Sequence, residues 1–385
     1  MDFELNDDQV AFADAAKAFA QSELEPNAAK WDEEEIFPVE VLRSAGEMGF
    51  CGLHTPEDVG GLGASRLDAS IVFEQLAMGC TSTTAFITIH NMATWMIAEF
   101  GNQVTREQWC PELAVGERLA SYCLTEPNAG SDAASLKSTA VKDGDNYIVN
   151  GSKVFISGAG STDVLVVMLR TSDNGAKGIS AFAIDAKTDG IIYGRKETKM
   201  GWNSQPTRMI TFENVVIPAS CLLGNEGDGF KIAMMGLDGG RINIATCSIG
   251  TAQAALNKAR DYMHERKQFG KSLASFQALQ FKLADMTTEL VAARQMVRLA
   301  AAKLDAKHPD RSTYCAMAKR FATDVGFNVC DEALQIFGGY GYTKEYPLER
   351  YLRDNRVHRI LEGTNEVMRL IIARRALEEG AADIL

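Results

Sequence analysis

Three short segments of the chain combine a turn with polar or charged groups that could do chemistry. Residues 122–135 read YCLTEPNAGSDAAS, a strand-like stretch followed by a turn rich in Pro, Asn, Gly and Asp. Successive backbone N–H groups exposed in such a turn can bind polar or anionic parts of a flat cofactor. Residues 335–342 read QIFGGYGY, and residues 360–366 read ILEGTNE, which places Glu362 before a Gly-Thr pair.

Each segment also has a simpler interpretation. The turn at 126–132 can be an ordinary surface loop, and the glycines at 338–341 can form the C-cap of a helix. They do not form a dinucleotide-binding fingerprint, because no strand precedes them and the third glycine is missing. Glu362 can be an exposed carboxylate before a helix. In a dry pocket, however, its pKa would rise and it could remove a weakly acidic proton.

The histidines and cysteines add no second chemistry. Histidines at 54, 90, 264, 308 and 358 lie in no triad or metal pattern, so we expect packing or surface roles. The eight cysteines lack the close spacing of a zinc site, and we expect reduced core residues of an intracellular protein. The sequence contains neither a GxSxG motif nor a phosphate-binding P-loop.

Length and charge limit the class of protein. The chain has 385 residues and a formal net charge of −12, which indicates two or three domains and disfavours nucleic acid or anionic membranes as partners. The acidic N-terminus resembles neither a signal peptide nor an Arg-rich transit peptide, and no run of eighteen apolar residues occurs. We therefore expect no membrane span and a location in a bacterial cytoplasm, or in the mitochondrial matrix after processing.

The elements that must position these segments change character twice along the chain. We expect an α+β multidomain protein with an N-terminal all-α domain (1–120), a central β domain (121–227) and a C-terminal four-helix bundle (228–385). Expected helices cover about 38–49, 65–79, 82–100, 105–115, 229–264, 273–306, 310–338, 346–357 and 362–379. Expected strands cover 147–156, 163–170, 179–184 and 209–217.

Segments 122–132 and 335–341 resemble the two signatures of the acyl-CoA dehydrogenase family, and the resemblance extends over essentially the whole chain. It implies a helical, β and helical fold that binds FAD and introduces a double bond α,β to the carbonyl of an acyl-CoA. In such an enzyme a base takes the α-proton from the thioester, and the β-hydrogen leaves as hydride to N5 of the flavin.

The resemblance also implies roles for individual residues. Glu362 falls at the position of the catalytic base, and Gly240 occupies the place where some relatives carry that base instead. Phe155 and Ser157 stand where the family often has Trp and Thr. The implied FAD contacts are Tyr122, Cys123, Leu124, Thr125, Gly130, Ser131, Phe155, Ile156, Ser157, Arg266, Phe269, Gln277, Gln335, Ile336, Gly338, Gly339, Thr364 and Glu366. The implied substrate contacts are Ser131, Asp238, Arg241, Leu361, Gly363 and Arg374, and His90 is a further candidate for the acyl pocket.

Segments 201–208, 236–245 and 360–369 resemble members that act on short branched acyl-CoAs. The expected reaction converts isobutyryl-CoA to methacrylyl-CoA in valine catabolism. A 2-methylbutyryl or straight short-chain substrate is the close alternative, since one methylene changes binding by only about 1–3 kcal/mol. An acyl-CoA or nitroalkane oxidase of the same fold and a non-enzymatic acyl-CoA-binding helical protein remain further alternatives.

Two partners follow from the same resemblance. Segment 266–270 is similar to the segment that reaches the FAD of a neighbouring subunit, although by itself it reads as the basic, glycine-capped end of a helix. The chain is therefore expected to form a homo-oligomer, a dimer of dimers. An electron-transfer flavoprotein is the expected acceptor, and no metal is expected.

Overall fold

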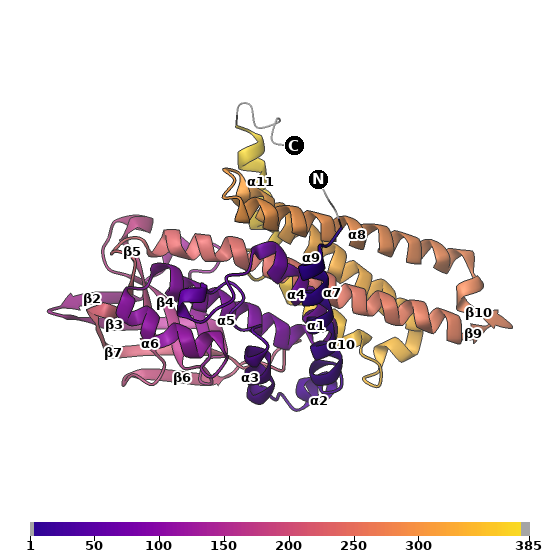
Figure 1. Ribbon diagram of the computed structural model, residues 1–385, viewed down its shortest axis with the longest axis horizontal. Helices are drawn as coiled ribbons and strands as arrows, with labels where there is room; N and C mark the ends of the chain where they lie inside the picture. Colours follow the sequence, from indigo (N-terminus) through magenta and orange to yellow (C-terminus); the bar gives the residue numbers. More distant parts are fainter. Residues whose placement is uncertain (1–3, 379–385) are drawn as a thin grey trace.

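The computed structural model describes residues 4–378, and the chain forms a helical, a β and a second helical part in that order (Figure 1). A capping box starts the first helix. The Asn6 side chain accepts from the Gln9 N–H at 2.8 Å, and the Gln9 side chain accepts from the Asn6 N–H at 3.3 Å. The N-terminal helices are α1 (Asp7–Phe19), α2 (Ala28–Glu33), α3 (Val39–Glu47), α4 (Arg66–Gly79), α5 (Thr81–Phe100) and α6 (Gln103–Ala114).

The middle part is a mostly antiparallel sheet with the strand order β6-β7-β3-β2-β4-β5-β8, and β1 pairs in parallel with β4. β4 and β5 are buried on both faces, because α5 and the long helix α7 (Gly229–Glu265) pack against one face of these strands. The strands are β1 (Ala120–Cys123), β2 (Thr139–Asp143), β3 (Asn146–Ser157), β4 (Val164–Arg170), β5 (Ile179–Asp185), β6 (Ile191–Lys196), β7 (Thr207–Pro218) and β8 (Leu222–Leu223).

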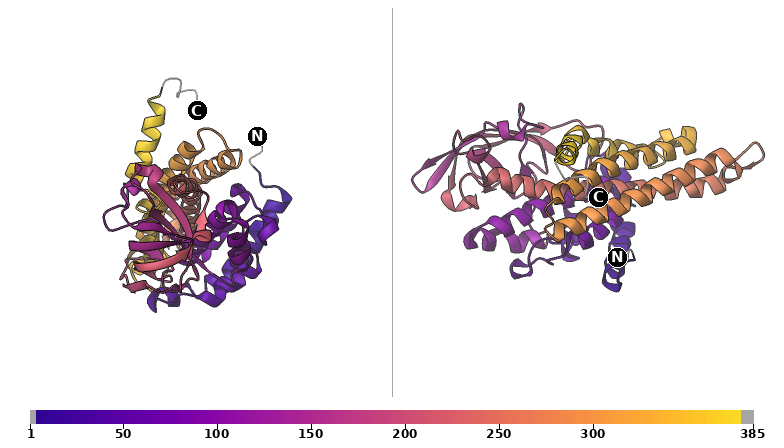
Figure 2. Two further views of the ribbon diagram at one scale, coloured as in Figure 1. Left: turned by 90° about the vertical axis from the view of Figure 1, so that its left-hand side faces the viewer. Right: turned by 90° about the horizontal axis from the view of Figure 1, so that it is seen from above.

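The C-terminal part is built on α7 (Gly229–Glu265), which runs from the β sheet to the far end of the molecule (Figure 1). Glycines let its neighbours approach closely: a Cβ on Gly250 would lie 2.3 Å from the Glu74 carbonyl of α4. Figure 2 shows α7, α8 and α9 extending side by side. The other elements are α8 (Gln277–Asp305), α9 (Arg311–Phe337), α10 (Leu348–Arg356) and α11 (Asn365–Ala376).

Most of the expected elements are present, and the differences are local. The predicted bundle contains three long helices, and its remaining side is formed by the short α10 and α11, which pack on α9. The start predicted for the last helix, residue 362, is wrong. Glu362 and Gly363 have left-handed backbones, and the helix begins at Asn365. Residue 379 and the rest of the expected third domain to 385 lie outside the described residues.

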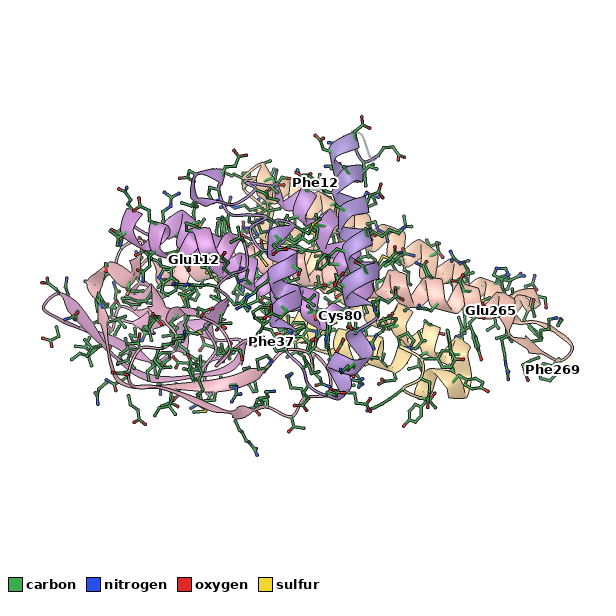
Figure 3. The ribbon with its side chains drawn as sticks, turned by 60° about the horizontal axis from the view of Figure 1, so that its bottom comes forward. Phe12, Phe37, Cys80, Glu112, Glu265 and Phe269 are labelled. Carbon is green, nitrogen blue, oxygen red and sulfur yellow. The ribbon has the colours of Figure 1, made fainter. Side chains whose placement is uncertain are left out.

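Segment 266–270 is not a simple helix end. α7 ends at Glu265, and β9 (Lys267–Gln268) and β10 (Lys271–Ser272) form a hairpin whose turn residues Phe269 and Gly270 have φ of 53° and 80°. These two positive φ values suit a two-residue hairpin turn. Phe269 projects from the tip, 93% exposed (Figure 3).

The cysteine and membrane expectations can be compared with the described part of the chain. All eight cysteines are free thiols, and seven are buried while Cys221 is half-buried, so the expectation of reduced core residues is confirmed. Between residues 4 and 378 no helix is long and apolar enough to cross a membrane.

Candidate active site

Glu362 lies in a tight turn between the short helix Val357–Arg359 and α11. Its own φ is 56° and that of Gly363 is 88°, a pair of left-handed residues that reverses the chain. Thr364 then caps α11, since its hydroxyl accepts from the Val367 N–H at 3.2 Å. A glutamate with positive φ is uncommon, and such strain is concentrated at functional sites.

The Glu362 side chain points at the surface of α7. A Cβ added to Gly240 would lie 2.5 Å from Glu362 Oε2 and 3.2 Å from the sulfur of Met92. Contacts below 3.0 Å are not tolerated by real Cβ atoms, so the carboxylate can occupy this place only because residue 240 is glycine.

The carboxyl group of Glu362 is electrostatically unusual. Its Oε2 atom is buried and has no hydrogen-bond partner within the described residues. Burial raises the pKa of Glu362 to about 7, and the positive charges of Arg241 and Lys319 oppose that rise. A half-buried carboxylate with a free oxygen and a pKa near neutrality can accept a proton from a weak carbon acid.

Arg241 and Asp238 form a buried pair beside this carboxylate. The Arg241 guanidinium donates to Asp238 Oδ1 at 2.7 Å, and its Nε lies 3.4 Å from the carbonyl oxygen of Glu362. Ser312 donates to the second oxygen of Asp238. Both charged residues are about 6% exposed, so Arg241 is not the solvated charge that its position near a helix start would suggest.

The turn of the first signature is fixed by a buried carboxylate. Glu126 accepts from the Lys137 and Ser138 N–H groups at 2.6 and 2.9 Å and from Lys153 Nζ at 2.8 Å. The carbonyl of Thr125 accepts from the Val154 N–H at 2.9 Å, which ties the turn to β3. The sequence places this turn correctly after a strand, although β1 ends at Cys123 rather than at Thr125.

Two features of this region leave groups available to a ligand. The Tyr122 hydroxyl is buried without a partner in the described structure, and Glu362 is near enough that its charge raises the tyrosine pKa, after the larger effect of burial. Phe155 has φ 58° beside an irregularity in β3 and is 68% exposed. Gly130 and Ser131 are also exposed, whereas Cys123, Leu124 and Ile156 are buried beneath them.

The second signature lies in an open cleft of about 540 Å³ at the other end of the molecule, next to the β9–β10 hairpin. The cleft brings together four expected cofactor contacts, Arg266, Ile336, Gly338 and Gly339. No atom lies within 4 Å of a Cβ built on either glycine, so the backbone there is open to a ligand. Exposed Phe269, Gln277 and Gln335 are not among the residues that line the cleft.

The expected site residues therefore form two groups. Segments 122–131 and 155–157 belong to the β domain, where Tyr122 is close enough to Glu362 to feel its charge. Arg266, Phe269 and the 335–339 segment lie at the hairpin end, on the far side of the molecule (Figure 1). Within one chain these two groups are not brought together. Glu366 and Arg374 are exposed on α11, and Leu361 and Gly363 flank Glu362.

Sequence reasoning missed two buried lysines, Lys153 and Lys319, which are 0% exposed. His358 has the packing role expected for it, because it accepts from the Trp202 indole N–H at 3.2 Å and bonds Ser248 at 2.7 Å. Burial lowers the pKa of His358 to about 3, so this ring is neutral. The sequence around Lys319, CAMAKRFA at 315–322, carries no local signal that this lysine would be buried.

His90 has a structural position. One ring nitrogen accepts from the Ala120 N–H at 3.0 Å, and the other lies 2.9 Å from the carbonyl of Leu113. Burial lowers its pKa to about 4. The His90 ring therefore joins the backbone at Leu113 to the backbone at Ala120. This structural role differs from the acyl-pocket role considered for His90. Between residues 4 and 378 no cluster of acidic, His or Cys side chains could hold a metal ion.

A sheet between two helical parts, a glutamate whose buried oxygen has no partner in the described structure and two ligand-accessible turns fit an oxidoreductase of the flavin-dependent dehydrogenase class. Family comparison gives the same result. The N-terminal, middle and C-terminal domains of acyl-CoA dehydrogenases match residues 6–117, 121–215 and 227–377. The chain belongs to the acyl-CoA dehydrogenase family, and its cofactor is FAD.

Individual relatives are similar over nearly the full length. Mitochondrial isobutyryl-CoA dehydrogenase of Bos taurus is 53% identical over 97% of this chain and 90% of its own, and that of Dictyostelium discoideum is 56% identical over 96% and 89%. The structure of butyryl-CoA dehydrogenase from Megasphaera elsdenii superposes with a TM-score of 0.95 at 40% identity, covering 98% of this chain and all of that one.

The residues present fit FAD. The buried Tyr122 hydroxyl has no partner among residues 4–378, Phe155 offers an exposed ring, and Gly338 and Gly339 leave their backbone uncovered. A flavin needs a flat surface with polar groups, and a pyrophosphate needs backbone that can be approached closely. These two requirements are met by the two groups of residues described above.

Proposed function

We propose that this protein oxidises isobutyryl-CoA to methacrylyl-CoA, a step of valine catabolism, with Glu362 as the base. The observation that carries the proposal is the buried, unpartnered Oε2 of Glu362, held against Gly240 beside Arg241. The two isobutyryl-CoA dehydrogenases at 53% and 56% identity support the choice of a short branched substrate.

In the proposed reaction the Cα–H bond of the thioester breaks and the proton goes to the carboxylate of Glu362. Burial makes that carboxylate more basic, which the weak acidity of a thioester α-carbon requires. The backbone N–H of Glu362 donates to the thioester carbonyl and stabilises the negative charge that develops there. FAD, when bound, supplies the acceptor for the β-hydrogen and its electron pair.

Methionines support the choice of a short acyl group. A Cβ on Gly236 of α7 would lie 1.8 Å from Cε of Met96, one turn away from the contact between Gly240 and Met92. Both methionines are buried on α5. They pack along the face of α7 that carries Gly240, against which Glu362 lies, and this packing supports a short acyl chain over a long one.

The other expected residues keep the roles given above. We assign FAD contacts to the two groups of residues and substrate contacts to Ser131, Asp238, Arg241, Leu361, Gly363 and Arg374, within domains 1–120, 121–227 and 228–385. Because the two FAD groups lie at opposite ends of the chain, one FAD is shared between two copies (Figure 1). A dimer of dimers satisfies this requirement.

An electron-transfer flavoprotein is the proposed acceptor of the electrons. The two mitochondrial relatives support a location in the mitochondrial matrix or, for a bacterial source, in the cytoplasm. Rapid peroxide formation in air would instead favour an oxidase of the same fold.

Anaerobic mixing with isobutyryl-CoA tests the proposal. The flavin absorbance of the purified protein should bleach, and Glu362→Gln should retain FAD but abolish the bleaching. A panel of acyl-CoAs then tests the substrate. Preference for hexanoyl- or octanoyl-CoA would reject the branched short-chain assignment. A colourless preparation, which carries no flavin, would reject the assignment as a flavin-dependent enzyme.

A further inference from the structure

Lys319, in the first half of α9, has a position that the proposed reaction does not yet use. Its side chain is 0% exposed, although a lysine is rarely buried without a specific partner. Nζ donates to the carbonyl oxygen of Gly363 at 2.7 Å and to Oδ1 of Asn365 at 2.9 Å. Both acceptors belong to the turn that carries Glu362, and Gly363 is the next residue in the chain.

The same turn is held from α9 at a second point. The Asn365 amide donates to Thr323 and Asp324, each at 3.0 Å. Asn365 itself is about 3% exposed, so this connection is protected from water. α9 therefore fixes the residues that follow Glu362 through both a backbone carbonyl and a side chain.

We propose that Lys319 is a positioning residue for Glu362, which holds the Glu362–Gly363 peptide in its left-handed geometry and supplies a positive charge that favours the ionised base. The inference rests on the proposed function and names a residue that acts through Glu362 without touching substrate. No hydrogen bond joins Lys319 to the free Oε2, so the lysine sets the place and charge of the base and leaves its proton-accepting oxygen available.

Charged groups from every neighbouring element contribute to this balance. Burial lowers the pKa of Lys319 to about 7, and the negative charge of Glu362 is the largest effect in the other direction. The groups that face the Glu362–Lys319 pair are Tyr122 of β1, Asp238 and Arg241 of α7, Asp324 of α9, and Glu366 of α11. Removing the lysine charge leaves Arg241 as the one remaining cation in that set.

Burying the charge of a lysine costs folding free energy, so a buried lysine needs a reason to be there. Replacing a buried charge by an apolar side chain of similar size is often neutral or stabilising. Lys319 therefore offers a clean test, because a methionine can occupy its volume while removing both the charge and the donors.

The test uses Lys319→Met and the milder Lys319→Gln, with the FAD-loaded full-length enzyme and isobutyryl-CoA. The rate of anaerobic flavin bleaching is measured from pH 5.5 to 9. We expect the acidic limb of the pH profile to move upward by about one unit in both variants, with an about tenfold lower rate at pH 6. Lys258→Met, which removes a lysine charge from the partly exposed ion pair with Glu25, is the control and should leave the acidic limb of the pH profile in place.

Each outcome decides the inference. The positioning role would be overturned if the acidic limb of the pH profile stayed in place in the Lys319 variants. It would also be overturned if the only effect of both variants were loss of FAD or of the fold, with no shift of that limb in the fraction that still binds FAD. The proposed function is judged separately, by bleaching of the wild type and its absence in Glu362→Gln. If those two results hold while the Lys319 variants behave as wild type, only the role of Lys319 is rejected.

Discussion

Two buried Lys–Glu arrangements lie in different parts of the molecule, and they have opposite consequences for the carboxylate. In the β domain, Glu126 receives three hydrogen bonds, one from Lys153 and two from backbone N–H groups. Beside α7, Glu362 keeps a buried oxygen without a partner, and Lys319 bonds to the neighbouring backbone instead. A buried lysine is present in both places.

The difference is visible in the acidities. Burial would raise the pKa of Glu126, but the charge of Lys153 and the hydrogen bonds together bring it below its usual range. Burial raises the pKa of Glu362 to about 7. The two nearby cations, Arg241 and Lys319, lower this pKa only partly, because neither donates a hydrogen bond to Oε2. The donors aimed at the carboxylate, more than the nearby charge, distinguish a structural glutamate from a reactive one.

The largest expected effect comes from Glu362→Gln. Removing a general base lowers the rate by about 10²–10⁴-fold, so flavin bleaching by isobutyryl-CoA should nearly disappear while FAD stays bound. Glu126→Gln should keep the rate per bound flavin within a few-fold of the wild type. An equal loss in both variants, measured by stopped-flow absorbance, would remove the distinction between the two carboxylates.

Glu126→Gln should act on stability instead. It leaves the fully buried Lys153 charge without its partner, which costs about 3 kcal/mol or more of unfolding free energy. Urea unfolding followed by circular dichroism measures this loss. A variant as stable as the wild type would show that the pair does not hold the turn.

Gly240→Ala tests how the reactive carboxylate is placed. The new Cβ would lie 2.5 Å from Oε2 and must displace it, and a misplaced base lowers the rate by about 10²-fold. Gly339→Ala is the control, since no atom lies within 4 Å of its Cβ. That variant should weaken FAD binding and preserve the rate per bound flavin.

The pH dependence of stability should differ in sign for the two glutamates. The folded-state pKa of Glu362 lies above its ordinary value, so its contribution to stability is present below about pH 4.5 and is lost as the pH rises through 7. Glu362→Gln should therefore unfold at a higher temperature than the wild type at pH 8, but not at pH 5. Glu126→Gln should unfold at a lower temperature than the wild type at pH 8.

The smallest effect is expected from Met96→Ala. Shortening the side chain that packs on Gly236 opens space for one or two methylenes, worth about 1–3 kcal/mol in the relative kcat/KM of acyl-CoAs. Rates with isobutyryl-, butyryl- and hexanoyl-CoA measure the shift. Unchanged selectivity would place the end of the acyl pocket elsewhere.

The sequence predicts the three-part fold, and it locates the turns that carry the expected site residues where the signal is local. Helical periodicity locates α4, α5 and α7 within about two residues, and turn residues locate the first signature. It misses β2 and β6, because their mixed burial gives no clean alternation of apolar residues.

The contacts that make the site reactive depend on long-range packing. Lys319 becomes buried only when the turn at 363–365, more than forty residues later, packs on α9. Nothing in the local sequence distinguishes it from a lysine on an exposed face. The hairpin at 267–272 is missed because its turn has no typical turn sequence. Both turn residues have a positive φ, but one of them is Phe269, a residue type that does not signal such a turn, and only the other is a glycine, Gly270.

The backbone of Glu362 has a consequence for how this site can change over generations. Its φ of 56° is a conformation in which glycine carries no penalty, so mutational drift at this codon toward glycine would relieve strain. Such a chain would gain robustness and lose its base in one step. Selection on turnover must oppose that drift continuously, and homologues relieved of that selection should show glycine or asparagine at this place.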